Sequence, residues 1–164
     1  MNILKSFDTA FKRMKEKNWD YIYVLVDVHG TIFKPSYYDI ENYEYYPCAK
    51  TVLQLLTANP KIKLILWTST YMNEIDKYIH VMEKDYIKFD FINHNYDVKD
   101  TDIQYFGDKL YFNVGLDDKF GFDPEKDWAD ILDYLKKIIM SDNKFYGQQC
   151  QDEKITMAFR NLQN

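Results

Sequence analysis

The sequence predicts an α/β fold built on a parallel sheet, and three observations lead to this prediction. Short, nearly continuous apolar runs alternate along the chain with longer segments in which apolar residues recur at helical spacing. Strands buried on both faces have such apolar runs, and helical connections make neighbouring strands parallel. Several of the runs end on hydroxyl or acidic residues, which is typical of strand ends that line a ligand site. We therefore expect a three-layer α/β/α domain with a doubly wound parallel sheet.

Four segments have the composition of buried strands. The first contains Ile22, Val24 and Leu25 in the stretch "YIYVLVD", and the second is the apolar stretch "KIKLILW". The third and fourth, "IKFDFIN" and "LYFNVGLDD", are less uniform but still rich in aromatic and aliphatic residues. The four predicted strands are 21–27, 61–67, 87–93 and 110–118.

Four further segments carry apolar residues three and four positions apart, as amphipathic helices do. In the first, Phe7, Phe11 and Met14 lie on one face, and the last follows the pair Asp123–Pro124. The predicted helices are 6–17, 48–58, 71–85 and 125–139. We expect one domain over residues 1–164, with its core at about 20–140 and a polar C-terminal tail from about 141.

The composition is that of an acidic globular protein. Apolar residues make up 46% of the chain, and the net charge of -5 argues against binding nucleic acid through bulk positive charge. No segment has the roughly 18 apolar residues of a membrane span, and the N-terminus lacks the apolar core of a signal peptide. Cys48 and Cys150 have no zinc-site or disulfide-framework spacing. We expect a cytoplasmic protein with reduced thiols and no membrane partner.

Residues able to handle a phosphate group lie at the ends of the predicted strands. Asp27 ends the first strand, Thr68 follows the second, Lys109 precedes the fourth, and Asp117–Asp118 ends it. Carboxylates hold Mg²⁺ and can attack phosphorus, while hydroxyl and ammonium groups stabilise phosphate oxygens. Singly, each feature has a simpler explanation: a turn, a helix cap or a surface lysine. Their combination at the strand ends favours a phosphate site.

These motifs resemble those of the haloacid dehalogenase (HAD) superfamily of phosphohydrolases, from about Tyr21 to Trp128. "YVLVDVHGTIF" resembles the first motif, an apolar strand followed by Asp-x-Asp-Gly-Thr, and "LILWTS" resembles the second. "GDKLYFNVGLDDKFGF" resembles a form of the third and fourth motifs in small phage-type members, and "FDFINHN" resembles a segment of the same members. The resemblance implies a HAD-like, Rossmann-like domain that hydrolyses phosphate monoesters with Mg²⁺ through an aspartyl-phosphate.

The resemblance also implies a role for each matching residue. Asp27 is the expected nucleophile and a metal ligand, and the backbone carbonyl of His29 is a further metal ligand. Thr68 and Lys109 are expected to bind the substrate phosphate. Asp117–Asp118 is expected to complete the Mg²⁺ site, and the sequence does not decide which of the two aspartates contacts the ion directly.

His29 departs from the family pattern, because the family has an acid/base aspartate at this position. The role of the backbone carbonyl is independent of the side chain, but proton transfer by imidazole differs from proton transfer by a carboxyl group. Two interpretations stay open. One is a weak phosphohydrolase with His29 as a catalytic residue. The other is a catalytically impaired HAD-like protein that acts as a binding or regulatory module.

Neither position at which the family inserts a cap domain has room for one. Only "KPSYYDIENYEYYP" follows the first motif, and the segment between Asn93 and Lys109 is also short. We therefore expect an open site without a cap domain. The first gap contains five tyrosines, which either stack on a nucleobase or pack a short flap onto the body: Tyr37, Tyr38, Tyr43, Tyr45 and Tyr46.

The expected partner is a phosphorylated small molecule, a nucleotide or a nucleic-acid end phosphate. An open site suits bulky substrates, or it needs a neighbouring subunit to cover it, so a homo-oligomer stays open. The substrate itself is not specified by the sequence.

Overall fold

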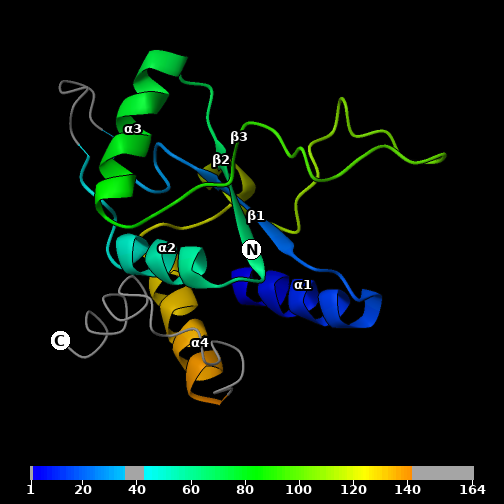
Figure 1. Cartoon of the computed structure of the whole chain (residues 1–164). Helices are drawn as coiled ribbons and strands as arrows, with labels where there is room; N and C mark the ends of the chain where they lie inside the picture. The colour runs from blue at the N-terminus through cyan, green and yellow to red at the C-terminus, as the bar shows by residue number, and fades with distance from the viewer. Residues whose placement is uncertain (1, 36–42, 142–164) are drawn as a thin grey trace.

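Four parallel strands form one sheet in the order β3-β2-β1-β4 (Figure 1). The computed structural model describes residues 2–35 and 43–141. Its strands are β1 (Ile22–Asp27), β2 (Ile62–Trp67), β3 (Phe91–Ile92) and β4 (Val114–Leu116). Strands β2 and β3 follow one another on one side of β1, and β4 lies on the other side of β1, so the strand order reverses there. A crevice that binds ligands is expected at such a reversal, beyond the carboxyl ends of the strands.

Within the described residues, four α-helices accompany the sheet and confirm the predicted alternation of strands and helices. They are α1 (Ile3–Lys17), α2 (Ala49–Ala58), α3 (Met72–Lys84) and α4 (Asp127–Ser141). Helix α1 begins earlier than the sequence pattern predicts because the side chain of Asn2 caps it by accepting a hydrogen bond from the Lys5 N–H. It ends at Asn18, which has a left-handed backbone conformation.

The third and fourth strands are shorter than the sequence predicts, and polar side chains explain the difference. At the third strand, the Asp90 carboxylate accepts a hydrogen bond from the Leu64 N–H (2.9 Å), in the place of a main-chain carbonyl. At the fourth, the Asn113 side-chain oxygen accepts from the Tyr23 N–H (2.7 Å) in the same way. The ladders therefore begin only after these residues, so the predicted ranges 87–93 and 110–118 are wrong in extent.

Different parts of the chain pack against the two faces of the sheet. Buried side chains of all four helices join one core cluster with Ile22, Val24 and Val26. Alternate residues of a strand face opposite sides, so Tyr23 faces away from this cluster. The Tyr23 ring packs edge-on against Tyr111, with 6.1 Å between centroids. The Rossmann-like parallel α/β sheet is thus confirmed, whereas a second helical layer, and with it the doubly wound three-layer detail, stays a prediction.

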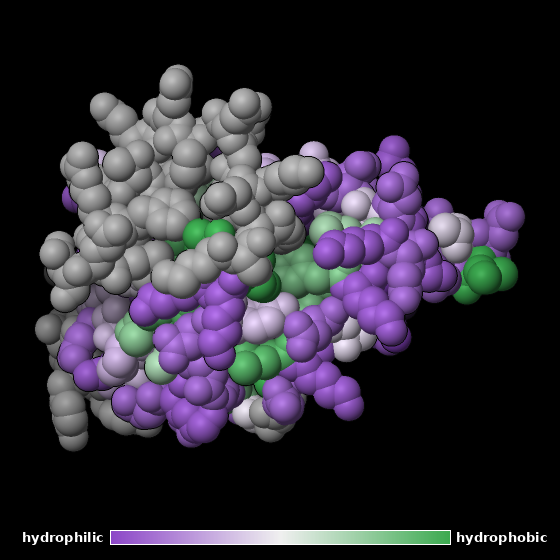
Figure 2. Space-filling model, turned by 90° about the horizontal axis from the view of Figure 1, so that it is seen from below, coloured by the Kyte–Doolittle hydropathy of each residue, from purple (hydrophilic) through white to green (hydrophobic). Residues whose placement is uncertain are grey.

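The segment between β3 and β4 extends away from the helices (Figure 1) and contains turns and one isolated bridge, between Thr101 and Gln104. Seen from below, the projecting part is mainly hydrophilic with an apolar spot at its end (Figure 2), and Ile103 of this segment is 93% exposed. In the described ranges, no helix is long and apolar enough to cross a bilayer.

The described part of the tyrosine-rich segment packs against the body. The rings of Tyr43 and Tyr45 lie 5.8 and 4.7 Å from the buried ring of Phe33, measured between centroids. This packing supports the flap interpretation for these two tyrosines. Tyr37, Tyr38, Cys150 and the tail beyond residue 141 lie outside the described residues.

Candidate functional site

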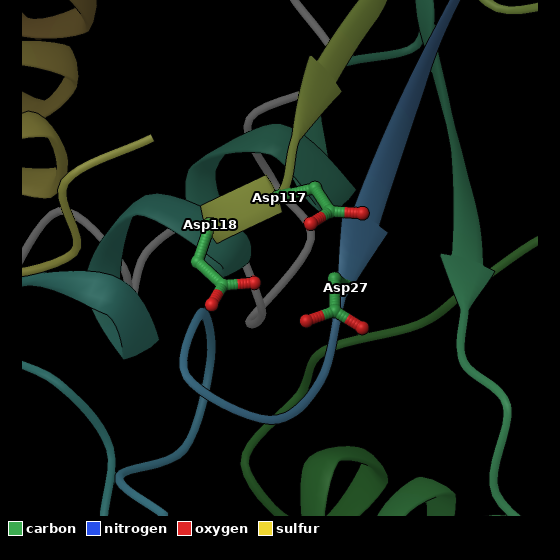
Figure 3. A group of neighbouring side chains, drawn as sticks. All are labelled: Asp27, Asp117 and Asp118. Carbon is green, nitrogen blue, oxygen red and sulfur yellow. The ribbon is translucent and has the colours of Figure 1, made fainter. Parts of the chain in front are cut away.

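Three carboxylates meet where the strand order reverses. Asp27 is the last residue of β1, and the Asp117–Asp118 pair follows β4, which is paired with β1. One carboxylate oxygen of each residue lies within 4.8 Å of those of the other two. Figure 3 shows the three side chains converging from the two adjacent strand ends. The sheet topology thus brings together acidic residues that are far apart in sequence.

These carboxylates fit a hard divalent cation. Mg²⁺ binds oxygen at about 2.0–2.1 Å, so two oxygens on one ion lie at most roughly 4.2 Å apart. The observed limit of 4.8 Å is within a small side-chain rotation of that requirement. A donor set made only of carboxylate oxygens suits Mg²⁺, Ca²⁺ or Mn²⁺ rather than metals that prefer thiolate or imidazole. Asp117 is 5% exposed, so its charge is poorly screened by water and favours a bound cation.

The electrostatics of the cluster raise the pKa of Asp27. Burial is the largest cause, and together with the neighbouring charges of Asp117 and Asp118 it raises the pKa of Asp27 to about 6. Hydrogen bonds from the Val28 N–H and the Thr31 hydroxyl oppose this rise, because they stabilise the carboxylate. The metal-free site therefore holds a negative charge at neutral pH only at a cost in free energy, which a cation would offset.

Asp27→Asn is expected to stabilise the metal-free protein at pH 7.5 but not at pH 4. The pKa of Asp27 is raised on folding from 3.8 to about 6, so its favourable contribution exists at low pH and is lost as the pH rises through about 6. A shift of this size corresponds to at most about 3 kcal/mol. Urea unfolding of both proteins in EDTA at the two pH values measures this difference. An equal difference in unfolding free energy at both pH values would contradict the prediction.

Thr31 links the two halves of the acidic cluster, a role that the sequence pattern did not reveal. Its side-chain oxygen donates to Asp27 Oδ2 (3.2 Å) and accepts from the Asp118 N–H (3.3 Å). The Thr31 carbonyl accepts a hydrogen bond from Trp128 Nε1 (2.8 Å), and both residues are fully buried. The first loop, the fourth strand end and helix α4 are thereby tied together behind the carboxylates.

Thr31→Val is expected to lower the free energy of unfolding by about 1–3 kcal/mol and to weaken Mg²⁺ binding. Valine has nearly the same shape, but it leaves the Asp118 N–H without its acceptor and removes one of the hydrogen bonds that Asp27 accepts. Thr31→Ser is the matched control, because it keeps the hydroxyl and should keep the Mg²⁺ affinity. Urea unfolding and calorimetric titration with Mg²⁺ test this. Equal Mg²⁺ affinities of the valine and serine variants would rule out the linking role.

His29 lies in the loop after β1, where its ring packs edge-on against Tyr78 of α3. The centroids are 5.2 Å apart, and His29 Nε2 and the Tyr78 hydroxyl share a hydrogen bond of 2.8 Å. Burial of the ring lowers the pKa of His29, and burial raises the pKa of the Tyr78 hydroxyl. A neutral imidazole next to a protonated tyrosine is therefore expected at neutral pH.

Thr68 follows β2 and is held in place by Asn93, which follows β3. The Thr68 N–H donates to Asn93 Oδ1 (2.8 Å), and Asn93 Nδ2 donates to the Thr68 carbonyl (2.7 Å). Asn93 has a φ of 51°, a left-handed conformation that asparagine tolerates better than most residues. The sequence predicted the position of Thr68 but not this reciprocal pair, which orients the loop that carries the hydroxyl.

A cavity of about 560 Å³ lies over the carboxylates and contains most of the predicted site residues. Its lining is Asp27, His29, Trp67, Thr68, Ser69, Asn93, Asp117, Asp118 and Lys119. Lys109, which the sequence motif favoured as a phosphate ligand, is exposed and does not line this cavity. Lys119 does, and its ammonium group contacts both Asp118 oxygens at 2.7 and 2.6 Å. The structure thus brings five of the six predicted residues together, and it adds a lysine that the pattern did not indicate.

Comparisons with known proteins support the fold. No protein-family model matches the chain, and no curated protein matches it. A solved structure, described as a conserved protein from Bacteroides thetaiotaomicron, is similar with 29% identity and a TM-score of 0.55. The match covers 71% of this chain and 91% of that chain. The likeness agrees with a parallel α/β sheet, and the description of that protein specifies no activity.

Proposed function

We propose that this protein is a HAD-like, Mg²⁺-dependent phosphohydrolase that cleaves phosphate monoesters through an aspartyl-phosphate on Asp27. The observation that carries the proposal is the convergence of Asp27 and the Asp117–Asp118 pair at the strand reversal, with oxygens within 4.8 Å. A hydroxyl loop and a lysine border the same cavity, as phosphate recognition requires. The motif resemblance of these residues to HAD phosphohydrolases agrees with this geometry.

The proposed reaction has two displacement steps. A carboxylate oxygen of Asp27 attacks phosphorus, the ester P–O bond breaks, and the leaving oxygen takes a proton from the protonated form of the His29 ring, which is the minor form at neutral pH. Water then loses a proton to the neutral His29 ring and attacks the same phosphorus, and the bond between phosphorus and Asp27 breaks, which restores the carboxylate and releases inorganic phosphate. Thr68 and Lys119 stabilise the phosphate oxygens in both steps.

The Mg²⁺ site would be formed by Asp27, the backbone carbonyl of His29 and the Asp117–Asp118 pair. The ion would supply positive charge against the phosphate oxygens. Asp118 contacts the Lys119 ammonium group, whereas Asp117 accepts a hydrogen bond from the Lys119 N–H (2.8 Å). Both carboxylates are therefore within reach of a cation, directly or through water.

A panel of phosphate monoesters, assayed with Mg²⁺ and with EDTA, tests the proposed function. We expect slow, Mg²⁺-dependent release of phosphate, fastest from activated small esters, because such leaving groups need little protonation. Calorimetric Mg²⁺ binding without any turnover on the panel would contradict the proposal. That outcome would favour a binding or regulatory module, which the engagement of His29 Nε2 by Tyr78 also favours.

Lys119→Met is expected to raise the KM for a phosphate ester roughly fivefold, because an exposed ammonium group contributes modestly to anion binding. The Lys119 side chain is 78% exposed but borders the cavity, whereas the exposed Lys109 does not. Lys109→Met should therefore leave KM within about twofold, a change too small for a group that contacts the bound anion. Steady-state rates and titration with inorganic phosphate measure both variants. A larger effect at Lys109 would support the role that the family resemblance implies for that residue.

A further inference from the structure

Trp67 stands beside the proposed nucleophile. It is the last residue of β2, and the parallel register pairs it with Asp27, the last residue of β1. Paired residues of neighbouring strands lie about 4.8 Å apart and point to the same face of the sheet. Trp67 and Asp27 line the same cavity. The indole is therefore within reach of any group esterified to a phosphate that Asp27 can attack.

The Trp67 ring is left partly open to solvent. Trp67 is 37% exposed, whereas Trp128 is fully buried with its indole N–H bonded to the Thr31 carbonyl. The three preceding residues of β2, 64–66, are also buried. A large aromatic side chain that is exposed inside a cavity, next to polar groups, offers an apolar surface for a ligand.

The cavity has room for more than a phosphate group. Its volume of about 560 Å³ falls within the range typical of sites for drug-sized ligands. The hydroxyls of Thr68 and Ser69, next to Trp67 in sequence, and the carboxylate cluster provide the polar part of the cavity. Trp67 provides a flat apolar surface between the second strand end and solvent.

We propose that Trp67 stacks against a planar aromatic ring in the leaving group of the substrate. The substrate class is then a small phosphate monoester that carries such a ring, as nucleoside monophosphates and phosphotyrosine do. Stacking against an aromatic side chain accepts any base or aryl group, because each has a π-face. The inference rests on the proposed phosphohydrolase function and specifies which esters it prefers.

Two measurements separate this inference from the proposed function. The first compares kcat/KM for AMP and ribose 5-phosphate, and for phosphotyrosine and phosphoserine, in the presence of Mg²⁺. Trp67→Ala should lower kcat/KM for the ring-bearing esters by at least about fivefold and at most about 150-fold, the range of stacking effects. The esters without a ring should change by less than about twofold, since they lose no stacking contact. For the ring-bearing esters, kcat/KM of Trp67→Phe should lie between the values of the wild type and of Trp67→Ala. Tyr105→Ala removes an exposed ring of the projecting segment and should leave kcat/KM unchanged for both classes of ester.

The second measurement follows binding by tryptophan fluorescence in the Asp27→Asn background with Mg²⁺, where turnover is blocked. AMP should quench the emission and ribose 5-phosphate should not, and Trp67→Phe should remove the quenching while Trp19 and Trp128 remain. Hydrolysis with equal losses for both classes of ester, or binding of AMP and phosphotyrosine without quenching by either, would overturn the inference and leave the function standing. Quenching by AMP with no hydrolysis of any ester would support the ring site and overturn the function. A response to phosphotyrosine alone would assign the ring to aryl phosphates, and a response to AMP alone to nucleotides.

Discussion

Asp27→Asn is expected to lower Mg²⁺-dependent hydrolysis of phosphate esters by at least about a thousandfold, because an amide cannot form the acyl-phosphate. The carboxylate ends β1 at the strand reversal and shares its site with two other acidic residues. Asparagine has the same size and can still accept the hydrogen bond from the Thr31 hydroxyl. The loss of activity should therefore occur in a folded protein, and without metal at neutral pH that protein should be more stable than the wild type.

The measurement is a comparison of initial rates with saturating Mg²⁺, after circular dichroism has shown that both proteins are folded. Asp76→Asn is a matched control, because Asp76 is an exposed aspartate of α3 that does not line the cavity. It should retain wild-type rates. Acid quenching of the wild-type reaction followed by mass spectrometry should reveal a phosphorylated peptide that contains Asp27. A fully active Asp27→Asn protein would show that Asp27 is not the nucleophile.

The core of the candidate site could be predicted from the residues that end the apolar runs of the sequence. Asp27, Thr68 and the Asp117–Asp118 pair follow apolar runs, and parallel strands bring their carboxyl ends to one edge. In the structure, these residues border one cavity. Local sequence patterns were enough to predict these residues, because burial determines which segments form strands and the parallel topology brings the carboxyl ends of those strands together.

Residues that act through long-range contacts could not be predicted in this way. Tyr78 reaches His29 from α3, and the apolar periodicity that predicts this helix does not show which loop the Tyr78 hydroxyl contacts. Asn93 holds Thr68 through two hydrogen bonds that depend on the left-handed turn after β3. Asp90 and Asn113 replace main-chain partners in the ladder, which shortens strands that look continuous in the sequence. Each of these effects depends on which polar side chain meets which backbone group, and periodicity carries no such information.

Lys109 and Lys119 also show that a sequence motif does not predict contacts between distant parts of the chain. The sequence motif pointed to Lys109, which precedes the fourth strand, but that part of the chain belongs to the segment that projects from the body. Lys119 follows the acidic pair and belongs to the short 3-10 helix Asp118–Phe120, whose turn returns its backbone to the Asp117 carboxylate. The path of the chain, and not the spacing in the motif, decides which ammonium group borders the cavity.

His29→Asp is expected to raise turnover of unactivated phosphate esters by at least about tenfold. General acid–base catalysis typically contributes about 10²–10⁴ in rate, and several features limit how much of it His29 can supply. Burial lowers the pKa of His29, so the ring is neutral at neutral pH, and a neutral imidazole is a much weaker acid than imidazolium. Its Nε2 is engaged by the Tyr78 hydroxyl at 2.8 Å, which leaves only the other ring nitrogen for the substrate. An aspartate at this position would restore the HAD motif that the sequence resembles, and it would remove the contact with Tyr78.

Rates for activated and unactivated esters, measured side by side with Mg²⁺, distinguish the role of His29 from a structural effect. A general acid matters most for poor leaving groups, so the gain from His29→Asp should be large for alkyl phosphates and small for nitrophenyl phosphate. Tyr78→Phe is the companion variant, because it frees Nε2 and keeps the ring that packs against Phe33 at 6.0 Å between centroids. It should give a smaller gain than His29→Asp, since the imidazole stays neutral. If the wild type hydrolyses alkyl phosphates rapidly and His29→Asp brings no gain, His29 is a competent general acid. In that case the imidazole already donates its proton to the leaving group, and the carboxyl group adds nothing.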